Sequence, residues 1–265
     1  ANNPDVDIVY SDCELWHNSN GTNKFCRRGF PLGMTNENTF LYQLKRSYLW
    51  SGLLFARRSA YLEFDEELSS AVDYDWYFKH YFKGSLVHFI DHPLARYRLH
   101  ENNTSKNLSK STKNVFKILN KYDFETVYDN LRGSFESEEL NISFAWYYFS
   151  INKFEKAIKK LTSVSSDNFD KHFLQGIIFA LGEEFPQATE SFQSICDKFP
   201  ENTESLNNLA VCLLKSQKRT PIACKLLKNA LKLNPNYLDA RYNLKAIESS
   251  KAHLGDLKLT LKPLR

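Results

Sequence analysis

Two aspartates, Asp73 and Asp75, stand two residues apart at the start of a segment with helical character. Carboxylates in the first turn of a helix are favoured by its exposed N–H groups and by its dipole, which also hold them in a fixed direction. Carboxylates are among the groups that accept protons in catalysis. The same position also suits a helix N-cap, which is the structural alternative for Asp73.

A second pair of reactive side chains, Arg98 and His100, follows the apolar run 86–90. The planar fork of an arginine suits phosphate groups, and a histidine can bind a divalent metal. A lone histidine after a strand more often makes a structural hydrogen bond, so both roles remain open for His100.

Several short motifs follow one another in a fixed order between residues 48 and 105. They are Phe64-Asp65-Glu66-Glu67-Leu68, the acidic helix start at 71–79, the apolar run 86–90, Tyr97-Arg98-x-His100 and Asn102-Asn103-Thr104-Ser105. This ordered set resembles the C-terminal part of a family 2 glycosyltransferase of the GT-A fold. Residues 5–12 resemble the strand just beyond the metal-binding DxD motif of those enzymes, so the resemblance covers about residues 4–105.

The resemblance implies that a sugar is transferred, with inversion, from a nucleotide-sugar donor to a hydroxyl group of a protein or glycan acceptor. It implies that Asp73 is the catalytic base, and that Asp75, Arg98 and Trp50 bind substrate. Trp50 would stack on a sugar face, although packing in a core is its more common role. His100 would bind a divalent metal, Mn²⁺ or Mg²⁺, that neutralises the leaving diphosphate.

The sequence departs from the family pattern at several places. Lys79 stands where the family often has arginine, and Val72 stands where many members carry glutamate. The nucleotide-binding half of the fold would precede residue 1, and Asp5-Val6-Asp7 opens a strand rather than ending one. We therefore expect this chain by itself to be inactive.

Composition limits the possible classes of protein. The 265 residues predict two domains, and 42% hydrophobic with 14% aromatic residues excludes a disordered chain. A net charge of +4 is too small to indicate a nucleic-acid partner. Five scattered cysteines and the lack of a long apolar run favour a cytoplasmic protein without a transmembrane segment or signal peptide.

The first hundred residues predict alternating strands and loops. Apolar runs at 7–10, 53–56 and 86–90 indicate buried strands, whereas the polar stretch 17–38 is typical of a long surface loop. Residues 106–135 predict a helical connector, and almost all of the chain beyond it predicts helix.

The second half of the sequence repeats itself. Ala157, Ala188 and Ala223 each precede a bulky apolar residue by four positions, and the intervals of 31 and 35 residues bracket the 34-residue period of a tetratricopeptide repeat. Small residues twelve or thirteen positions earlier, Ala145, Gly176 and Ala210, would let paired helices approach closely. The pattern resembles tetratricopeptide repeats over about residues 137–250, with a plain helical bundle as the alternative.

The expected fold class is therefore an α/β, partial GT-A-like domain followed by an all-α tetratricopeptide-repeat solenoid. The expected segments are residues 1–105, a connector at 106–135, and repeats with a C-terminal cap at 136–265. The leading hypothesis for function is a glycosyltransferase whose repeats recruit a protein acceptor or bind a peptide. The alternative is a non-catalytic repeat scaffold that carries a degenerate or truncated glycosyltransferase module. A third possibility is a repeat adaptor on an unrelated α/β domain.

Overall fold

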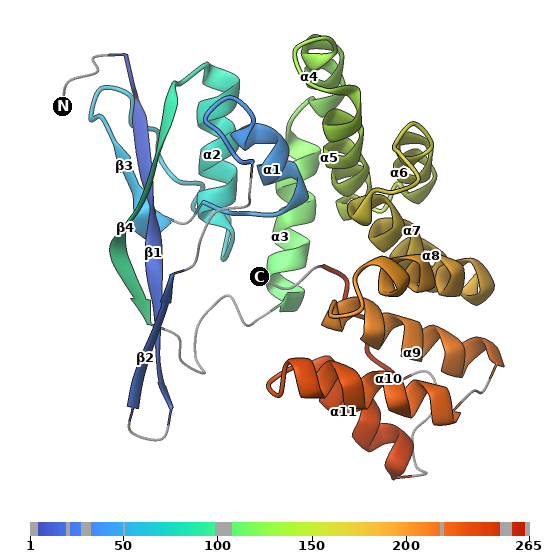
Figure 1. Cartoon of the computed structure of the whole chain (residues 1–265). Helices are drawn as coiled ribbons and strands as arrows, with labels where there is room; N and C mark the ends of the chain where they lie inside the picture. The colour runs from blue at the N-terminus through green and yellow to red at the C-terminus, as the bar shows by residue number, and fades with distance from the viewer. Residues whose placement is uncertain are drawn as a thin grey trace. The chain divides into compact units, whose positions relative to one another are not determined.

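The computed structural model describes residues 5–19, 22–27, 33–49, 51–98, 108–217, 220–249 and 256–262 (Figure 1). Its contacts divide the chain into two compact units, residues 1–153 and 154–265. The domain boundaries predicted near residues 105 and 135 both fall within the first unit. None of the helices in the described ranges is long and apolar enough to cross a membrane.

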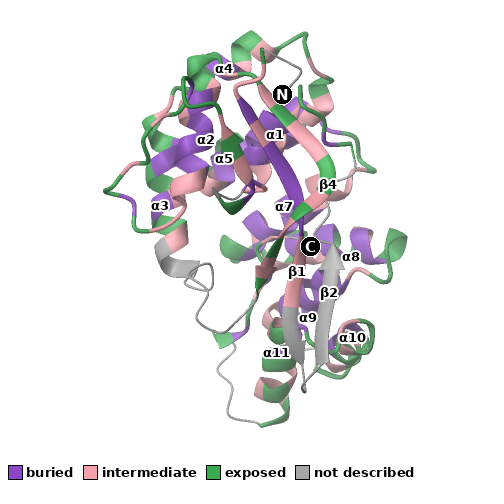
Figure 2. Ribbon diagram, turned by 90° about the vertical axis from the view of Figure 1, so that its left-hand side faces the viewer, coloured by how far each residue is buried: buried purple, intermediate pink, exposed green. Residues whose placement is uncertain are grey.

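A sheet of four strands forms one layer of the first unit. Its strands are β1 (Ile8–Ser19), β2 (Thr22–Arg27), β3 (Leu54–Ala56) and β4 (Val87–Arg98). β1 pairs with β2 and β3 in antiparallel fashion and with β4 in parallel fashion. The N-terminal half of β1 is coloured as buried in Figure 2, and Ile8 and Tyr10 are almost inaccessible to solvent.

The loop expected at 17–38 is partly wrong. β1 continues to Ser19 and turns into β2, so that Glu14 lies opposite Arg27 and Ser19 lies opposite Thr22. The residues of this hairpin are mostly polar. The strand propensity of single residues does not predict such a hairpin, because pairing between its two strands stabilises it. The motif Tyr97-Arg98 likewise lies inside β4 rather than after a strand.

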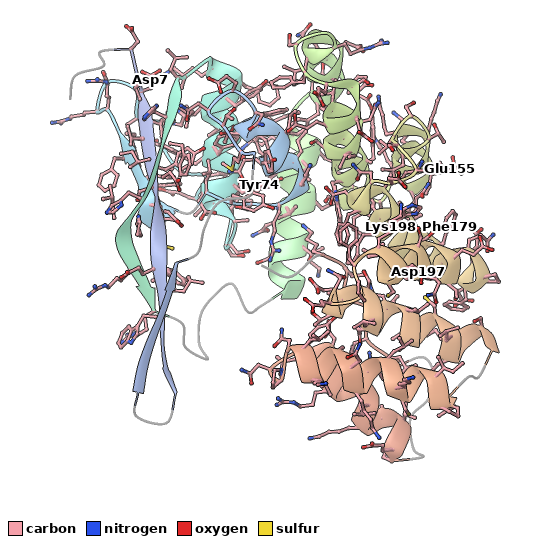
Figure 3. All side chains as sticks on the ribbon, in the orientation of Figure 1. Asp7, Tyr74, Glu155, Phe179, Asp197 and Lys198 are labelled. Carbon is pink, nitrogen blue, oxygen red and sulfur yellow. The ribbon has the colours of Figure 1, made fainter. Side chains whose placement is uncertain are left out.

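Five helices complete the first unit. They are α1 (Thr39–Lys45), α2 (Val72–Lys83), α3 (Leu108–Lys121), α4 (Phe124–Leu131) and α5 (Ser137–Ser150), and the 3₁₀ turn η1 (Ser51–Leu53) precedes β3. Aromatic rings join them: Phe124 contacts Phe40, Phe78 and Tyr147. Tyr74 of α2, labelled in Figure 3, donates a hydrogen bond from its hydroxyl to the carbonyl oxygen of Gln43.

Six helices are described in the second unit. They are α6 (Phe154–Leu161), α7 (Phe169–Leu181), α8 (Phe185–Lys198), α9 (Thr203–Gln217), α10 (Thr220–Leu233) and α11 (Leu238–Glu248). Helix α8 packs against both α7 and α9, and α10 packs against both α9 and α11. Helices α8, α9 and α10 therefore each lie between their neighbours in the sequence, as in a repeat solenoid.

The repeat residues occupy the positions that the sequence indicates. Ala157, Ala188 and Ala223 are fully buried, as are Leu161, Phe192 and Leu227 four positions after them. Asn152 and Glu183, which are 31 residues apart, both adopt the left-handed backbone conformation in turns between helices. The helical-repeat part of the expected fold class is thus confirmed, whereas the structure does not show the GT-A-like part.

Candidate functional site

Asp73, the expected catalytic base, lies in the first turn of α2 and is half-buried. The N-cap position belongs to Ala71, whose φ is 59°, so the alternative N-cap role of Asp73 is wrong. Its Oδ1 accepts a hydrogen bond of 3.0 Å from the backbone N–H of Tyr74. The carboxylate thereby binds one of the N–H groups at the start of the helix, which is a local structural role.

Asp75, an expected substrate-binding residue, is completely buried. The Lys121 ammonium lies 3.1 Å from its Oδ1, and the Tyr122 hydroxyl donates to the same oxygen at 2.8 Å. The Lys79 ammonium lies 3.4 Å from Oδ2. Because both carboxylate oxygens already face cationic or hydroxyl groups of the protein, the structure explains Asp75 as the centre of an internal ion-pair network.

The network extends to Asp65, whose carboxylate lies 3.1 Å from the Lys121 ammonium. The hydrogen bond from Lys121 lowers the pKa of Asp65. Burial lowers the pKa of Lys121, but its hydrogen bonds to Asp75 and Asp65 outweigh burial and leave it raised. Lys121 therefore joins α3 to α2 and to the loop before it.

Of the remaining expected site residues, the structure describes Arg98. Arg98 is exposed on β4, and its guanidinium lies 5.7 Å from the ring centroid of Trp16 on β1, a cation–π arrangement. Trp50 and His100 lie outside the described residues. Within the described ranges no group of three or more His, Cys, Asp or Glu side chains could hold a metal ion. The metal role of His100 stays a prediction.

The second unit contains a cluster of buried polar side chains that the sequence analysis missed. Asn207 and Asn208 on α9 and Asn243 on α11 are fully buried. They hold the segment 256–262, which we call the tail. We call the three asparagines the asparagine site.

The asparagine site binds the tail through its backbone. Asn243 accepts the N–H of Lys258 at 2.7 Å and donates to its carbonyl oxygen at 2.8 Å. Asn208 does the same for Thr260, at 2.8 and 2.9 Å. Asn207 adds a second donor to the carbonyl of Lys258 at 3.0 Å, and Asn243 in turn donates to Asn207. Asn243 and Asn208 thus each exchange two hydrogen bonds with the backbone of one tail residue, and the two tail residues are two positions apart, as in pairing with a neighbouring β-strand.

Two tail side chains are anchored as well. Leu257 and Thr260 are buried, whereas Lys258 and Leu261 are exposed. The Thr260 hydroxyl donates to Oδ2 of Asp239 at 2.6 Å and also hydrogen-bonds with the hydroxyl of Tyr237, just before α11. In the tail, the site therefore buries an apolar residue and, three positions later, a small hydroxyl residue.

The charges around the tail favour a basic segment. Burial raises the pKa of the Tyr237 hydroxyl, its hydrogen bond with Thr260 lowers this pKa, and the negative charges of Asp239 and Glu204 raise it further. The Lys258 ammonium lies 5.4 Å from the centroid of the Tyr242 ring. Carboxylates beside Thr260 and an aromatic face under Lys258 both suit positive charge and disfavour negative charge.

The sequence does contain a signal for this site. Asn207 and Asn208 stand between Leu206 and Leu209 in the middle of a helix, where asparagine is a poor helix former and apolar neighbours predict burial. A buried amide needs several hydrogen-bond partners, and the backbone N–H and C=O groups inside a helix are mostly paired with one another. The pattern therefore indicates a bound polar group, although it does not say that the group is backbone.

Replacing Asn243 by alanine is expected to release the tail. The variant removes the two hydrogen bonds between Asn243 and Lys258 and leaves the buried amide of Asn207 with one partner fewer. An unsatisfied buried group costs about 1–3 kcal/mol. Hydrogen–deuterium exchange should show faster exchange of the Lys258 and Thr260 amides. Asn236→Ala, at an exposed position before the same helix, is the control and should leave that exchange unchanged.

Stacked helical hairpins define a helical-repeat protein, and here they hold a segment of the same chain by its backbone. In agreement with this, the family model described as Coatomer epsilon subunit matches residues 102–256, which is more than half of the chain. The chain therefore belongs to the coatomer epsilon subunit family. A comparison with curated proteins gave no match.

This finding overturns the expected membership in glycosyltransferase family 2 and the functions expected with it, sugar transfer and a nucleotide-sugar donor. The matched range begins at residue 102 and takes in the helices α3–α11, so residues 1–101 fall outside it. The motifs that suggested the resemblance are short, and structural roles account for several of their residues. Asp65 and Asp75 bind Lys121, and Arg98 lies over Trp16.

Proposed function

We propose that the protein is a non-catalytic component of a coatomer-type protein coat, and that its helical repeats bind another coat protein. Membership in the coatomer epsilon subunit family is the observation that carries this proposal. The asparagine site supports it, because it recognises a peptide backbone. We also propose that the protein acts in the cytoplasm, and the free thiols of the buried residues Cys13, Cys196 and Cys212 are consistent with a reducing compartment.

The test is reconstitution with purified coat proteins. The full chain is mixed with coatomer that has been prepared without its epsilon subunit, and the mixture is analysed by size-exclusion chromatography and isothermal titration calorimetry. We expect the chain to elute with the coat proteins and to bind with a dissociation constant below about 1 µM, which corresponds to about 8 kcal/mol of binding free energy.

A destabilised variant serves as the control for specificity. Gly176→Val places a branched side chain against Phe192 inside the repeats, and it should reduce the association in proportion to the loss of folded protein. If the folded wild-type chain elutes separately from the coat proteins at micromolar concentrations, the proposed function is wrong.

A further inference from the structure

The asparagine site has the features of a receptor that is occupied by a replaceable ligand. Its three amides are fully buried and lie on α9 and α11, and they would be left without their partners if the tail departed. The tail itself is mostly accessible to solvent. Only Leu257 and Thr260 of the seven tail residues are buried, and the remaining contacts involve mainly backbone hydrogen bonds.

We propose that the asparagine site is a binding site for an extended, basic peptide segment of a partner protein, and that the tail competes with this segment within the same chain. The inference rests on the proposed function, because it assumes that the repeats bind a protein partner. Backbone hydrogen bonds do not depend on which side chains a peptide carries. The contacts made by the side chains of Leu257, Lys258 and Thr260 therefore determine which peptides bind. The partner segment carries an apolar residue, then a lysine or arginine, and a threonine or serine three positions after the apolar residue.

Each position of this pattern follows from a contact of the tail. The apolar residue takes the buried place of Leu257, and the basic residue takes the place of Lys258 over Tyr242. The hydroxyl residue takes the place of Thr260 and donates to Asp239. A phosphorylated threonine does not fit, because a phosphate group would face the carboxylate of Asp239 in a buried position.

The competition can be measured with a full-length chain whose own tail no longer binds. Leu257→Asp with Thr260→Glu places two carboxylates in the buried positions of the tail. The probe is a fluorescein-labelled peptide of the tail sequence Asp-Leu-Lys-Leu-Thr-Leu-Lys, and its binding is followed by fluorescence anisotropy. We expect it to bind the altered chain at least 10-fold more tightly than the wild-type chain, in which the attached tail has a high effective concentration.

Three further measurements test the details. The peptide phosphorylated on its threonine should bind at least 10-fold more weakly. In the chain with the altered tail, Asn208→Asp should weaken binding at least 10-fold because it loses the donor to the threonine carbonyl, whereas Asn236→Asp should have no effect. Thermal unfolding of every variant shows whether it is folded.

Several outcomes would overturn the inference. One is a folded chain with the altered tail that does not bind the peptide, and another is binding that does not depend on Asn208. If light scattering shows that the wild-type chain is a dimer and that the tail substitutions make it a monomer, the tail binds a second copy instead. Coat association of the same variants separates the two proposals. Association without peptide binding contradicts only the inference, and peptide binding without association contradicts only the proposed function.

Discussion

Gly176→Ala is expected to lower the stability of the helical repeats, although the same change in an open helix would raise it by about 1 kcal/mol. A β-carbon at Gly176 would lie 2.7 Å from the tip of the Phe192 ring, closer than carbon atoms can approach. The ring has little room to move, because it is fully buried and packs edge-to-face on Phe173 with the ring centroids 6.0 Å apart.

Overpacking of this kind costs about 1–3 kcal/mol, and we expect a net loss of about 1 kcal/mol or more after the gain in helix propensity. The free energy of unfolding is measured by urea denaturation followed by circular dichroism. Gly182→Ala is the matched control, since a β-carbon there would make only ordinary contacts at 3.5 Å, and it should be neutral or stabilising.

Relief of the contact provides a second test. Phe192→Leu alone should be destabilising because it shortens a buried side chain, but in its presence Gly176→Ala should cost less than it does in the wild-type chain. If Gly176→Ala is equally costly in both backgrounds, the close approach of α7 and α8 at this point is not the cause of the loss.

Lys121→Met is expected to destabilise the first unit by about 2 kcal/mol. Removing one partner of a buried ion pair costs about 3–5 kcal/mol because the other charge is left in a low-dielectric interior. We expect a smaller loss here because the Lys121 side chain is 42% exposed, so that solvent screens the pair, and because Lys79 and Tyr122 still face the carboxylate of Asp75. The measurement is again the free energy of unfolding, and Lys117→Met on the exposed face of α3 is the control.

A double variant tests whether the charge of Asp75, left without Lys121, causes this loss of stability. Asp75→Asn removes the carboxylate while keeping its size, so Lys121→Met with Asp75→Asn should be more stable than Lys121→Met alone. A double variant that is less stable than the single one would contradict an ion-pair role for Asp75.

The ion pair between Lys121 and Asp65 also predicts how the stability of the first unit depends on pH. The hydrogen bond from Lys121 lowers the pKa of Asp65 in the folded chain. The pair therefore contributes to the free energy of unfolding above the pKa that Asp65 has in the unfolded chain, and this contribution is lost as the pH falls through the pKa of Asp65 in the folded chain.

The sequence determined the repeated part of the fold. The spacing of Ala188 and Phe192 and the small residue Gly176 predict paired helices in close contact, and the structure places all three at one helix packing interface. This prediction succeeds because a hairpin repeat is local: its residue types and intervals are set by neighbouring helices that are close in the sequence.

The tertiary structure decided the roles of the polar residues. The resemblance made Asp75 a substrate-binding residue, yet in the folded chain its carboxylate pairs with Lys121, 46 residues away. The tail meets Asn208 over a separation of 52 residues, and no sequence pattern specifies that contact. A local period can be found in one sequence because helix geometry fixes it, whereas the partner of a buried polar group depends on which distant segment the folded chain brings within hydrogen-bond distance.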